Sequence, residues 1–209
     1  LSALLQGHGH PSGAALSSVV PPATSALRPA LEGLSGRPPI VVEPGLRTGL
    51  AINIDNPREV GADRVVNAIA ALERFGAPVI VVDFGTATTV DLVGPDGDYR
   101  GGAIAPGLEV AANALVEATA ALRRVEVVPP RSVVGRSTVE AIQSGLVYGY
   151  AGLVDGLIER MQAELGLPDV PTVAGGGLAP VIGPHCRLVH EIDDDLTLRG
   201  LRIVYERNR

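Results

Sequence analysis

The spacing of hydrophobic and polar positions along the chain predicts an α/β fold. Residues 79–82 are four consecutive apolar side chains, mostly β-branched, which is typical of a strand buried on both faces. An acid, Asp83, a glycine and three threonines follow before a second strand begins. Further short strands are predicted at residues 39–42, 171–174 and 188–192. The central stretch is therefore expected to be a strand–turn–strand with polar groups at its bend.

Segments with helical periodicity alternate with these strands. Apolar residues recur at helical spacing between Gly61 and Gly76, which places Asp63 in the first turn of a helix. Ser137 and Glu140 have the spacing of a capping box at the start of the longest helix. The remaining helices are expected at residues 1–7, 23–34 and 108–122, and from residue 196 onward, and a hairpin is expected to join residues 89–93 to residues 99–104.

The longest helix carries glycines at four positions, Gly145, Gly149, Gly152 and Gly156. Glycine costs roughly 1 kcal/mol relative to alanine in a helix interior, so close packing has to offset it. We expect this helix to be tightly packed, either in the core or against a second copy of the chain.

The bend after residue 82 has the composition of an anion-binding turn. Gly85 lets the backbone approach a ligand closely, and backbone N–H groups and threonine hydroxyls can donate to it. Asp83, at the strand end, would face the cation that accompanies a phosphate. A plain hairpin with a threonine-rich turn is the alternative. The glycines at 175–177, between a strand and a helix, are a weak sign of a nucleotide site.

Two helix starts carry further candidate chemistry. Asp63 either complements the dipole of its helix or acts as a general base beside a bound anion, with Arg64 as the fork that holds a carboxylate. Thr138, beside the predicted cap, would offer its hydroxyl to a ligand at the positive end of its helix. Residues 193–195, three consecutive aspartates, are expected to form a solvated turn.

Composition narrows the range of ligands and compartments. Aromatic residues make up only 3% of the 209 residues and the net charge is −6, both of which disfavour nucleic acid and favour a small polar ligand. Cys186 is the single cysteine, which excludes an internal disulfide and agrees with a reducing cytoplasm. His8 and His10 are expected to be solvated rather than metal-bound. No apolar run approaches the roughly 20 residues of a membrane span, so we expect a protein that needs no membrane.

Taken together, these segments resemble the type III pantothenate kinases of the sugar-kinase and actin-like ATPase superfamily. The resemblance covers nearly the whole chain in order: residues 17–22, 55–57, 61–64, 83–89, 102–107 and 137–145, and the glycines 175–177. It implies an α/β fold of two actin-like (ribonuclease H-like) lobes, of which the first is incomplete. Residues 1–78 would be the remainder of the N-terminal lobe, and residues 79–209 the C-terminal lobe.

The resemblance also implies an activity and its residues. The activity is ATP-dependent phosphorylation of pantothenate to 4′-phosphopantothenate, the first step of coenzyme A biosynthesis, by a homodimer. Asp63 would be the proton acceptor, Asp83 the ligand of a monovalent cation (K⁺ or NH₄⁺), and Thr86 a contact to ATP, which carries Mg²⁺. The pantothenate-binding residues would be Gly61, Ala62, Asp63, Arg64 and Thr138.

The sequence departs from the family pattern at two points. The family's first strand ends in an Asp-x-Gly-Asn-Thr phosphate loop, which does not occur in this sequence, so the chain as given is expected to turn over slowly or not at all. Ile54 stands where many relatives carry tyrosine, which removes one polar contact to the substrate. A non-catalytic relative that binds a ligand or a partner protein remains the alternative.

Overall fold

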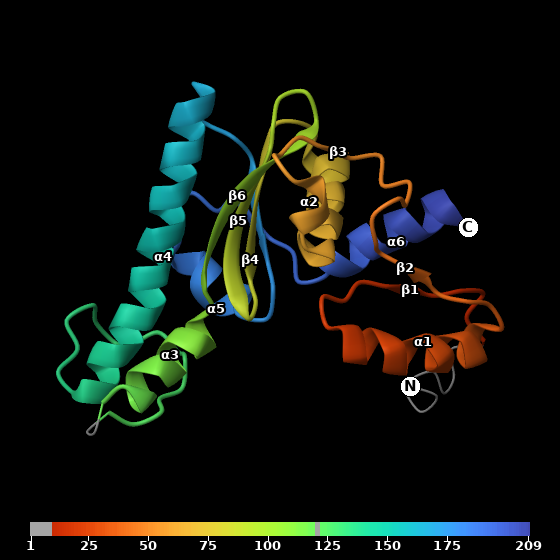
Figure 1. Ribbon diagram of the computed structural model, residues 1–209. Coiled ribbons are helices and arrows are strands. Elements are labelled where there is room, and N and C mark those ends of the chain that lie inside the picture. Colours follow the sequence, from red (N-terminus) through yellow and green to blue (C-terminus); the bar gives the residue numbers. More distant parts are fainter. Residues whose placement is uncertain (1–9, 120–121) are drawn as a thin grey trace.

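The computed structural model describes residues 10–119 and 122–209, and it shows a mixed α/β protein built on one central sheet. In Figure 1 helices cover both faces of this sheet, with α4 on one side and α2 and α6 on the other. The helix expected at residues 1–7 lies outside the described residues. Within the described residues, no helix combines the length and apolar character that crossing a membrane requires.

The central sheet has six strands in the order β3-β6-β5-β4-β7-β8. Their bounds are β3 Ala51–Ile52, β4 Val79–Phe84, β5 Ala87–Val93, β6 Asp98–Pro106, β7 Thr172–Gly175 and β8 Glu191–Ile192. The antiparallel meander β4-β5-β6 confirms the predicted hairpins, with Asp83 opposite Thr89. Strand β7 pairs with β4 in parallel, and β8 pairs with β7 in parallel. The meander therefore forms the middle of the sheet, with β4 between β5 and β7.

Helices α2 (Ala62–Phe75) and α6 (Leu196–Asn208) cover one face of the sheet. The start and end of α2 agree with the prediction. Gly200 of α6 lies directly against the backbone carbonyl of Val66, where a β-carbon would collide. The two helices consequently pack with their backbones in close approach.

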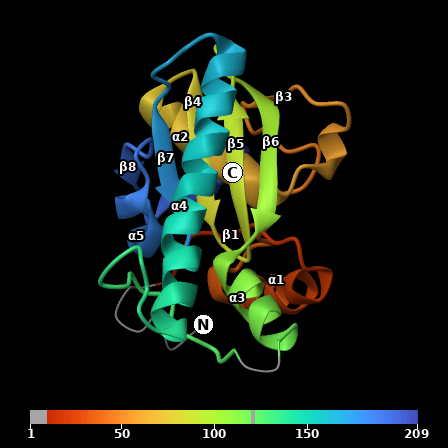
Figure 2. The same cartoon turned by 90° about the vertical axis from the view of Figure 1, so that its left-hand side faces the viewer.

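The other face is covered by α3 (Leu108–Glu117), α4 (Thr138–Leu165) and the short α5 (Ala179–Ile182), which is followed by the 3-10 turn Gly183–His185. Figure 2 shows α4 lying along the sheet. The predicted end of α3 at residue 122 is wrong, because the helix ends at Glu117 and the hydroxyl of Thr119 donates to the carbonyl of Leu115 at 2.7 Å.

The cap of α4 differs from the predicted capping box in one bond. The Ser137 hydroxyl accepts from the amide of Glu140 at 3.2 Å, as expected. The Glu140 carboxylate accepts from the amide of Arg136 at 3.0 Å instead of that of Ser137. The loop before the helix, rather than the cap residue itself, is held by this carboxylate.

The glycine-bearing side of α4 is open. No atom of the described residues lies within 4 Å of the place where a β-carbon would stand on Gly145, Gly149 or Gly152, apart from the neighbouring residues of the helix itself. The tight packing expected at these glycines is therefore not found in the core of this chain.

A small unit precedes α2 in the sequence. It contains β1 (Ala15–Leu16), α1 (Pro21–Ser35) and β2 (Ile40–Val41), with β1 and β2 paired in parallel, and it is followed by the 3-10 turn Pro57–Glu59. In Figure 1 it lies on the α6 side of the molecule. Residues 17–22, whose sequence is typical of a strand end that runs into a turn, lead directly into a helix instead. Pro21 and Pro22 occupy the first positions of α1, where proline has no helical N–H bond to lose.

The aspartate loop is not the solvated turn that the sequence suggested. Asp193 is only 6% exposed. Its carboxylate accepts from Arg74 at the end of α2 at 2.8 Å and from Arg199 of α6 at 3.0 Å. Asp193 thus ties the two helices together, while Asp194 and Asp195 remain exposed.

Candidate active site

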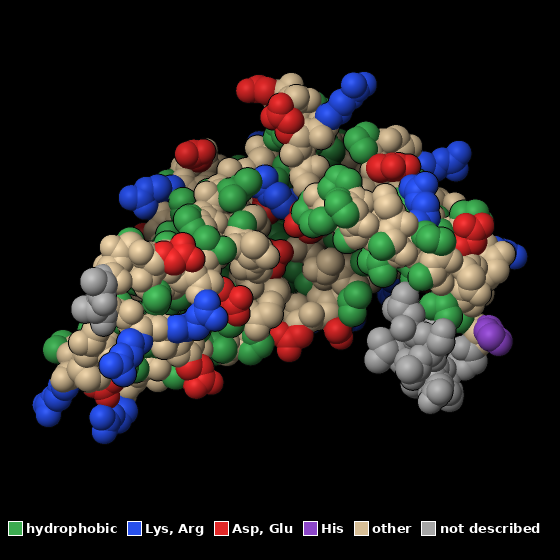
Figure 3. All heavy atoms as spheres, turned by 60° about the horizontal axis from the view of Figure 1, so that its bottom comes forward, with side chains coloured by type: hydrophobic (Ala, Val, Ile, Leu, Met, Phe, Trp, Pro, Cys, Tyr) green, Lys and Arg blue, Asp and Glu red, His purple; other side chains and the backbone are tan. Residues whose placement is uncertain are grey.

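The candidate site lies where β4 and β7 end side by side. Because the two strands run parallel with Asp83 opposite Gly175, the turn after β4 meets the glycines after β7 at one edge of the sheet. Ligands of open α/β sheets commonly bind beyond the carboxyl ends of the strands. Figure 3 looks onto this end of the molecule, which is hollowed and has acidic side chains around the hollow.

The glycines at this edge permit close backbone contacts. Gly176 has φ +91°, and a β-carbon there would stand 2.7 Å from the carbonyl oxygen of Phe84 and closer still to Oδ1 of Asp83. Gly107 is equally constrained, because its β-carbon would stand 2.5 Å from the carbonyl oxygen of Gly85. Gly107 is thus packed against the chain's own backbone.

Thr86 lies at the tip of the turn after β4. Its carbonyl accepts from the amide of Gly107 at 3.0 Å, and this bond stabilises the turn. Thr86 itself is exposed. The amide of Gly85 donates to the carbonyl of Ala87 at 3.1 Å. The turn is consequently held by the backbone and presents the side chain of Thr86 to solvent.

Asp63 lies in the first turn of α2, on the helix that covers this edge. Its Oδ1 accepts from the amide of Arg64 at 2.8 Å. A β-carbon on Gly61 would stand 2.5 Å from that oxygen, so glycine is required there for the carboxylate to take this position. One carboxylate oxygen is held by the helix start, which leaves Oδ2 to accept a further proton or hydrogen bond.

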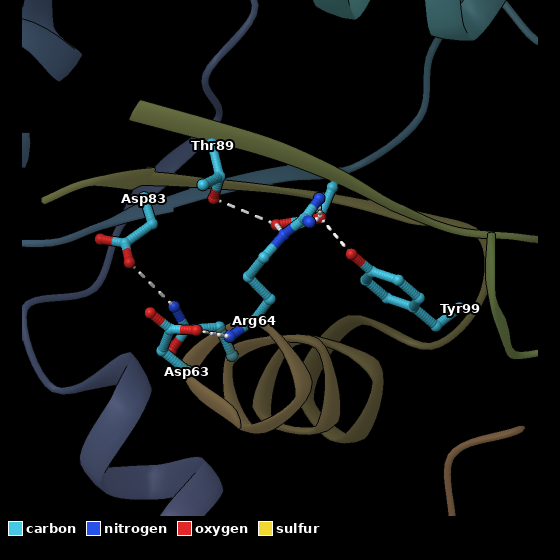
Figure 4. A network of polar contacts seen from close by, with 7 residues as sticks. Asp63, Arg64, Asp83, Thr89 and Tyr99 are labelled. Carbon is cyan, nitrogen blue, oxygen red and sulfur yellow. Dashed lines mark hydrogen bonds and ion pairs between the residues drawn. The ribbon is translucent and has the colours of Figure 1, made fainter. Parts of the chain in front are cut away.

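Arg64 points into the protein and is paired with Asp91 (Figure 4). Its Nε donates to Asp91 Oδ1 at 2.9 Å, and its Nη2 donates to the same carboxylate. Asp91 also accepts from the hydroxyl of Tyr99 at 2.6 Å and from that of Thr89 at 3.1 Å. The fork expected to hold a substrate carboxylate is therefore occupied along its Nε edge by a carboxylate of the protein.

Asp83 has far fewer partners. Its Oδ2 accepts one long hydrogen bond, 3.4 Å, from Nδ2 of Asn67. Burial, together with the negative charges of Asp63 and Asp91, raises the pKa of Asp83 to about 6. This carboxylate lacks nearby positive charge within the described residues.

The surroundings of Asp83 suit a monovalent cation. Oδ1 of Asp83 and the carbonyl oxygen of Phe84 lie close together beside Gly176. Oxygen atoms of this kind are the ligands that hard cations prefer. The described residues contain no cluster of three His, Cys, Asp or Glu side chains that would suit a transition metal. A potassium-like ion bound by one carboxylate and backbone oxygens does not require such a cluster.

Thr138 is not brought to this site by the chain's own fold. It is exposed in the first turn of α4, on the opposite face of the sheet from α2, and it borders an apolar groove of about 940 Å³ between α3 and α4. Among the described residues, no hydrogen bond links it to Asp63, Arg64 or Asp83.

Four site residues were missed by sequence reasoning: Asn67, Asp91, Tyr99 and Thr197. Two of them carry a local signal, since Asn67 follows Asp63 by one helical turn and Asp91 shares a strand face with Thr89. Thr197 carries none, because its partner Asn67 is 130 residues away, whereas Tyr99 meets Asp91 across the β5–β6 hairpin, 8 residues away.

Comparison with a solved structure agrees with this fold. A structure from Campylobacter jejuni, of a conserved protein assigned to the Baf family of transcriptional activators, superposes with a TM-score of 0.62 over 98% of this chain and 86% of its own, at 17% identity. That likeness concerns the fold alone. The sheet and the polar groups at its strand ends define an α/β protein with a candidate site at that edge of the sheet.

Sequence relatives narrow the class to one family. The sequence profile described as "Type III pantothenate kinase" matches residues 1–160. Proteins named type III pantothenate kinase are 55% identical in Nocardia farcinica (94% of this chain, 76% of theirs), 53% identical in Myxococcus xanthus (92% and 75%) and 51% identical in Koribacter versatilis (94% and 72%). The chain belongs to the type III pantothenate kinase family.

Proposed function

We propose that this protein transfers the γ-phosphoryl group of ATP to pantothenate, giving 4′-phosphopantothenate and ADP in the first step of coenzyme A biosynthesis. The observation that carries the proposal is the position of Asp63, on the helix start that covers the oxygen-rich end of β4. The named relatives support the same substrate. They also disfavour the alternative of a non-catalytic binding protein.

The proposed chemistry needs one proton acceptor. Oδ2 of Asp63 takes the proton of the pantothenate hydroxyl while the oxygen of that hydroxyl bonds to the γ-phosphorus of ATP. At the same time the bond between the γ-phosphorus and the bridging oxygen breaks, and that oxygen leaves with ADP. Because Oδ1 accepts from the amide of Arg64, the orientation of the carboxylate is fixed before substrate binds. Orientation of this kind lowers the barrier without a further conformational change.

The phosphate groups of ATP are negatively charged and would bind beside acidic side chains, so they require cations to offset the repulsion. Thr86 would contact ATP, Mg²⁺ would accompany the nucleotide, and Asp83 would hold K⁺ or NH₄⁺ beside Gly176. These cations offset the repulsion between the nucleotide and the acidic side chains around the hollow (Figure 3).

For pantothenate we propose the run from Gly61 to Arg64, with Thr138 as a further contact. Arg64 can contribute only its Nη1 edge, since Nε and Nη2 donate to Asp91. Its guanidinium is oriented by that pair rather than free to follow a ligand. We also propose that residues 1–78 belong to one lobe and residues 79–209 to a second, and that the protein is cytoplasmic.

The activity is tested directly by incubating the protein encoded by its gene with pantothenate, MgATP and K⁺, and by detecting the phosphorylated product by mass spectrometry. We expect one phosphate per pantothenate and one ADP per product. ATP hydrolysis without a phosphorylated pantothenate would contradict the proposed substrate.

A homodimer is proposed from the open side of α4. Gly145, Gly149 and Gly152 are exposed, and the neighbouring groove carries Val110 and Leu115, which are 46% and 42% exposed. Apolar surface of this kind marks protein contacts.

Light scattering at micromolar concentration should give twice the chain mass, and Gly149→Gln should shift the protein toward monomer. Gly33→Gln is the matched control, because Gly33 is an exposed helical glycine of α1 that also has open space around it. A monomeric parent protein at all concentrations would contradict the proposal.

A further inference from the structure

Asn67 joins the C-terminal helix to the candidate site. It is 2% exposed and lies one turn after Asp63 on the face of α2 toward the sheet. Its amide oxygen accepts from the hydroxyl of Thr197, in the first turn of α6, at 2.7 Å. Its Nδ2 donates to Oδ2 of Asp83, a bond drawn in Figure 4. The amide therefore has a different partner at each end.

The hydroxyl of Thr197 holds the amide of Asn67 in the orientation that gives Asp83 a donor. An ionised carboxylate can only accept, so the NH₂ group of Asn67 faces Asp83, and the hydroxyl of Thr197 donates to the amide oxygen on the α6 side. Without that donor, the amide oxygen of Asn67 loses the hydrogen bond that fixes the plane of the amide, and the NH₂ group is held less firmly against Asp83.

The bond from Asn67 also determines which oxygen of Asp83 is available. Oδ2 is engaged by the amide, whereas Oδ1 lies beside Gly176 and the carbonyl of Phe84. If the carboxylate rotated, Oδ1 would leave this group of oxygens. The orientation of Asp83 is thus coupled to α6, which is itself fixed to α2 by Gly200 and by Asp193.

We propose that Thr197 and Asn67 are positioning residues, which hold the carboxylate of Asp83 with Oδ1 facing the cation position beside Gly176. This inference rests on the proposed role of Asp83 as a ligand of a monovalent cation. Thr197 acts only through Asn67, and neither residue has to contact substrate.

The test measures the melting temperature of the 209-residue chain during titration with KCl, with NaCl at equal ionic strength as reference. Binding of K⁺ to the folded state raises the melting temperature by mass action, so the titration gives an apparent affinity without any turnover. Thr197→Val removes the hydroxyl at nearly constant volume. Thr197→Ser retains it and is the matched control. Asp83→Asn, alone and combined with Thr197→Val, completes a double-mutant cycle.

We expect Thr197→Val to need about tenfold more KCl for half of the K⁺-specific shift, the usual scale for removing a partner of a metal ligand. Thr197→Ser should stay close to the parent. Asp83→Asn should abolish the shift, and Thr197→Val should add nothing in that background. A purely structural role of Thr197 would instead lower the melting temperature equally in both salts. If Thr197→Val does not fold, Thr197→Ala takes its place in the same cycle.

Two results would overturn the inference. If the parent responds to KCl and Thr197→Val responds with the same midpoint, the positioning role is wrong while the cation role of Asp83 stands. If the parent shows no difference between KCl and NaCl, the cation role of Asp83 fails and the inference fails with it.

Discussion

Two carboxylates on neighbouring strands, the partly buried Asp83 and the buried Asp91, have opposite surroundings. Asp91 accepts from Arg64, Tyr99 and Thr89, so its charge is neutralised and its oxygens are satisfied by the protein. Asp83 accepts a single long bond from Asn67. Buried charges are normally paired, and an exception requires an explanation. The difference agrees with a structural role for Asp91 and with the role of cation ligand that we propose for Asp83.

The largest effect is expected from removing the satisfied carboxylate. Asp91→Ala leaves the guanidinium of Arg64 largely buried and unpaired, which should lower the free energy of unfolding by about 3–5 kcal/mol. Denaturant unfolding followed by circular dichroism measures this change. Asp96→Ala is the control, because the exposed pair between Asp96 and Arg100 should contribute at most about 1 kcal/mol. Equal losses in the two variants would remove the distinction between Asp91 and a surface acid.

A smaller effect, of opposite sign, is expected at Asp83. Its pKa in the folded protein is about 6 and its ordinary value is 3.8, so the folded state binds the proton more tightly than the unfolded chain. This group therefore destabilises the fold progressively as the pH rises from 3.8 to about 6. Without K⁺, Asp83→Asn should be more stable than the parent above pH 6 and should lose that advantage near pH 4. Melting temperatures across this range test the sign, and an advantage that is constant with pH would refute it.

The smallest effect is expected from a single donor to Asp91. Thr89→Val removes one of several hydrogen bonds to this carboxylate and should cost about 1 kcal/mol, with little change in K⁺ binding. Unfolding and the KCl titration together measure both quantities. A shift in the K⁺ midpoint as large as that expected for Thr197→Val would show that the two carboxylates do not act separately.

Much of the fold could be predicted because its signals are local. The apolar run of β4, the turn residues of the β5–β6 hairpin and the first turn of α2 each depend on a few adjacent residues. The end of α3 was misplaced because neither glycine nor proline marks Glu117 as the last helical residue. Local composition therefore predicts where a helix starts more reliably than where it ends, when no glycine or proline follows its last residue.

The site could be predicted only in part, for a related reason. Asp63, Asp83 and Thr86 lie in short sequence motifs from which their candidate roles as proton acceptor, cation ligand and ATP contact can be predicted. The partners of Arg64 and Asn67 lie 27 and 130 residues away in the sequence, and Asp193 meets Arg74 across 119 residues. These pairs form only when α2 packs against the sheet and α6, so a local sequence pattern cannot predict which residues pair.

The proton acceptor is the central element of the account, and replacing Asp63 by asparagine tests it most directly. Steady-state kinetics of the full-length protein encoded by its gene, with pantothenate and MgATP, should show kcat lowered by about 10²-fold or more while KM for pantothenate changes little, because a general base acts in the transition state. Glu109→Gln is the matched control, since Glu109 is also a first-turn acid, in α3, and shares any effect of the helix dipole. If Asp63→Asn retained near-normal kcat, or fell no further than Glu109→Gln, Asp63 would be only a helix-dipole residue and the proposed mechanism would be wrong.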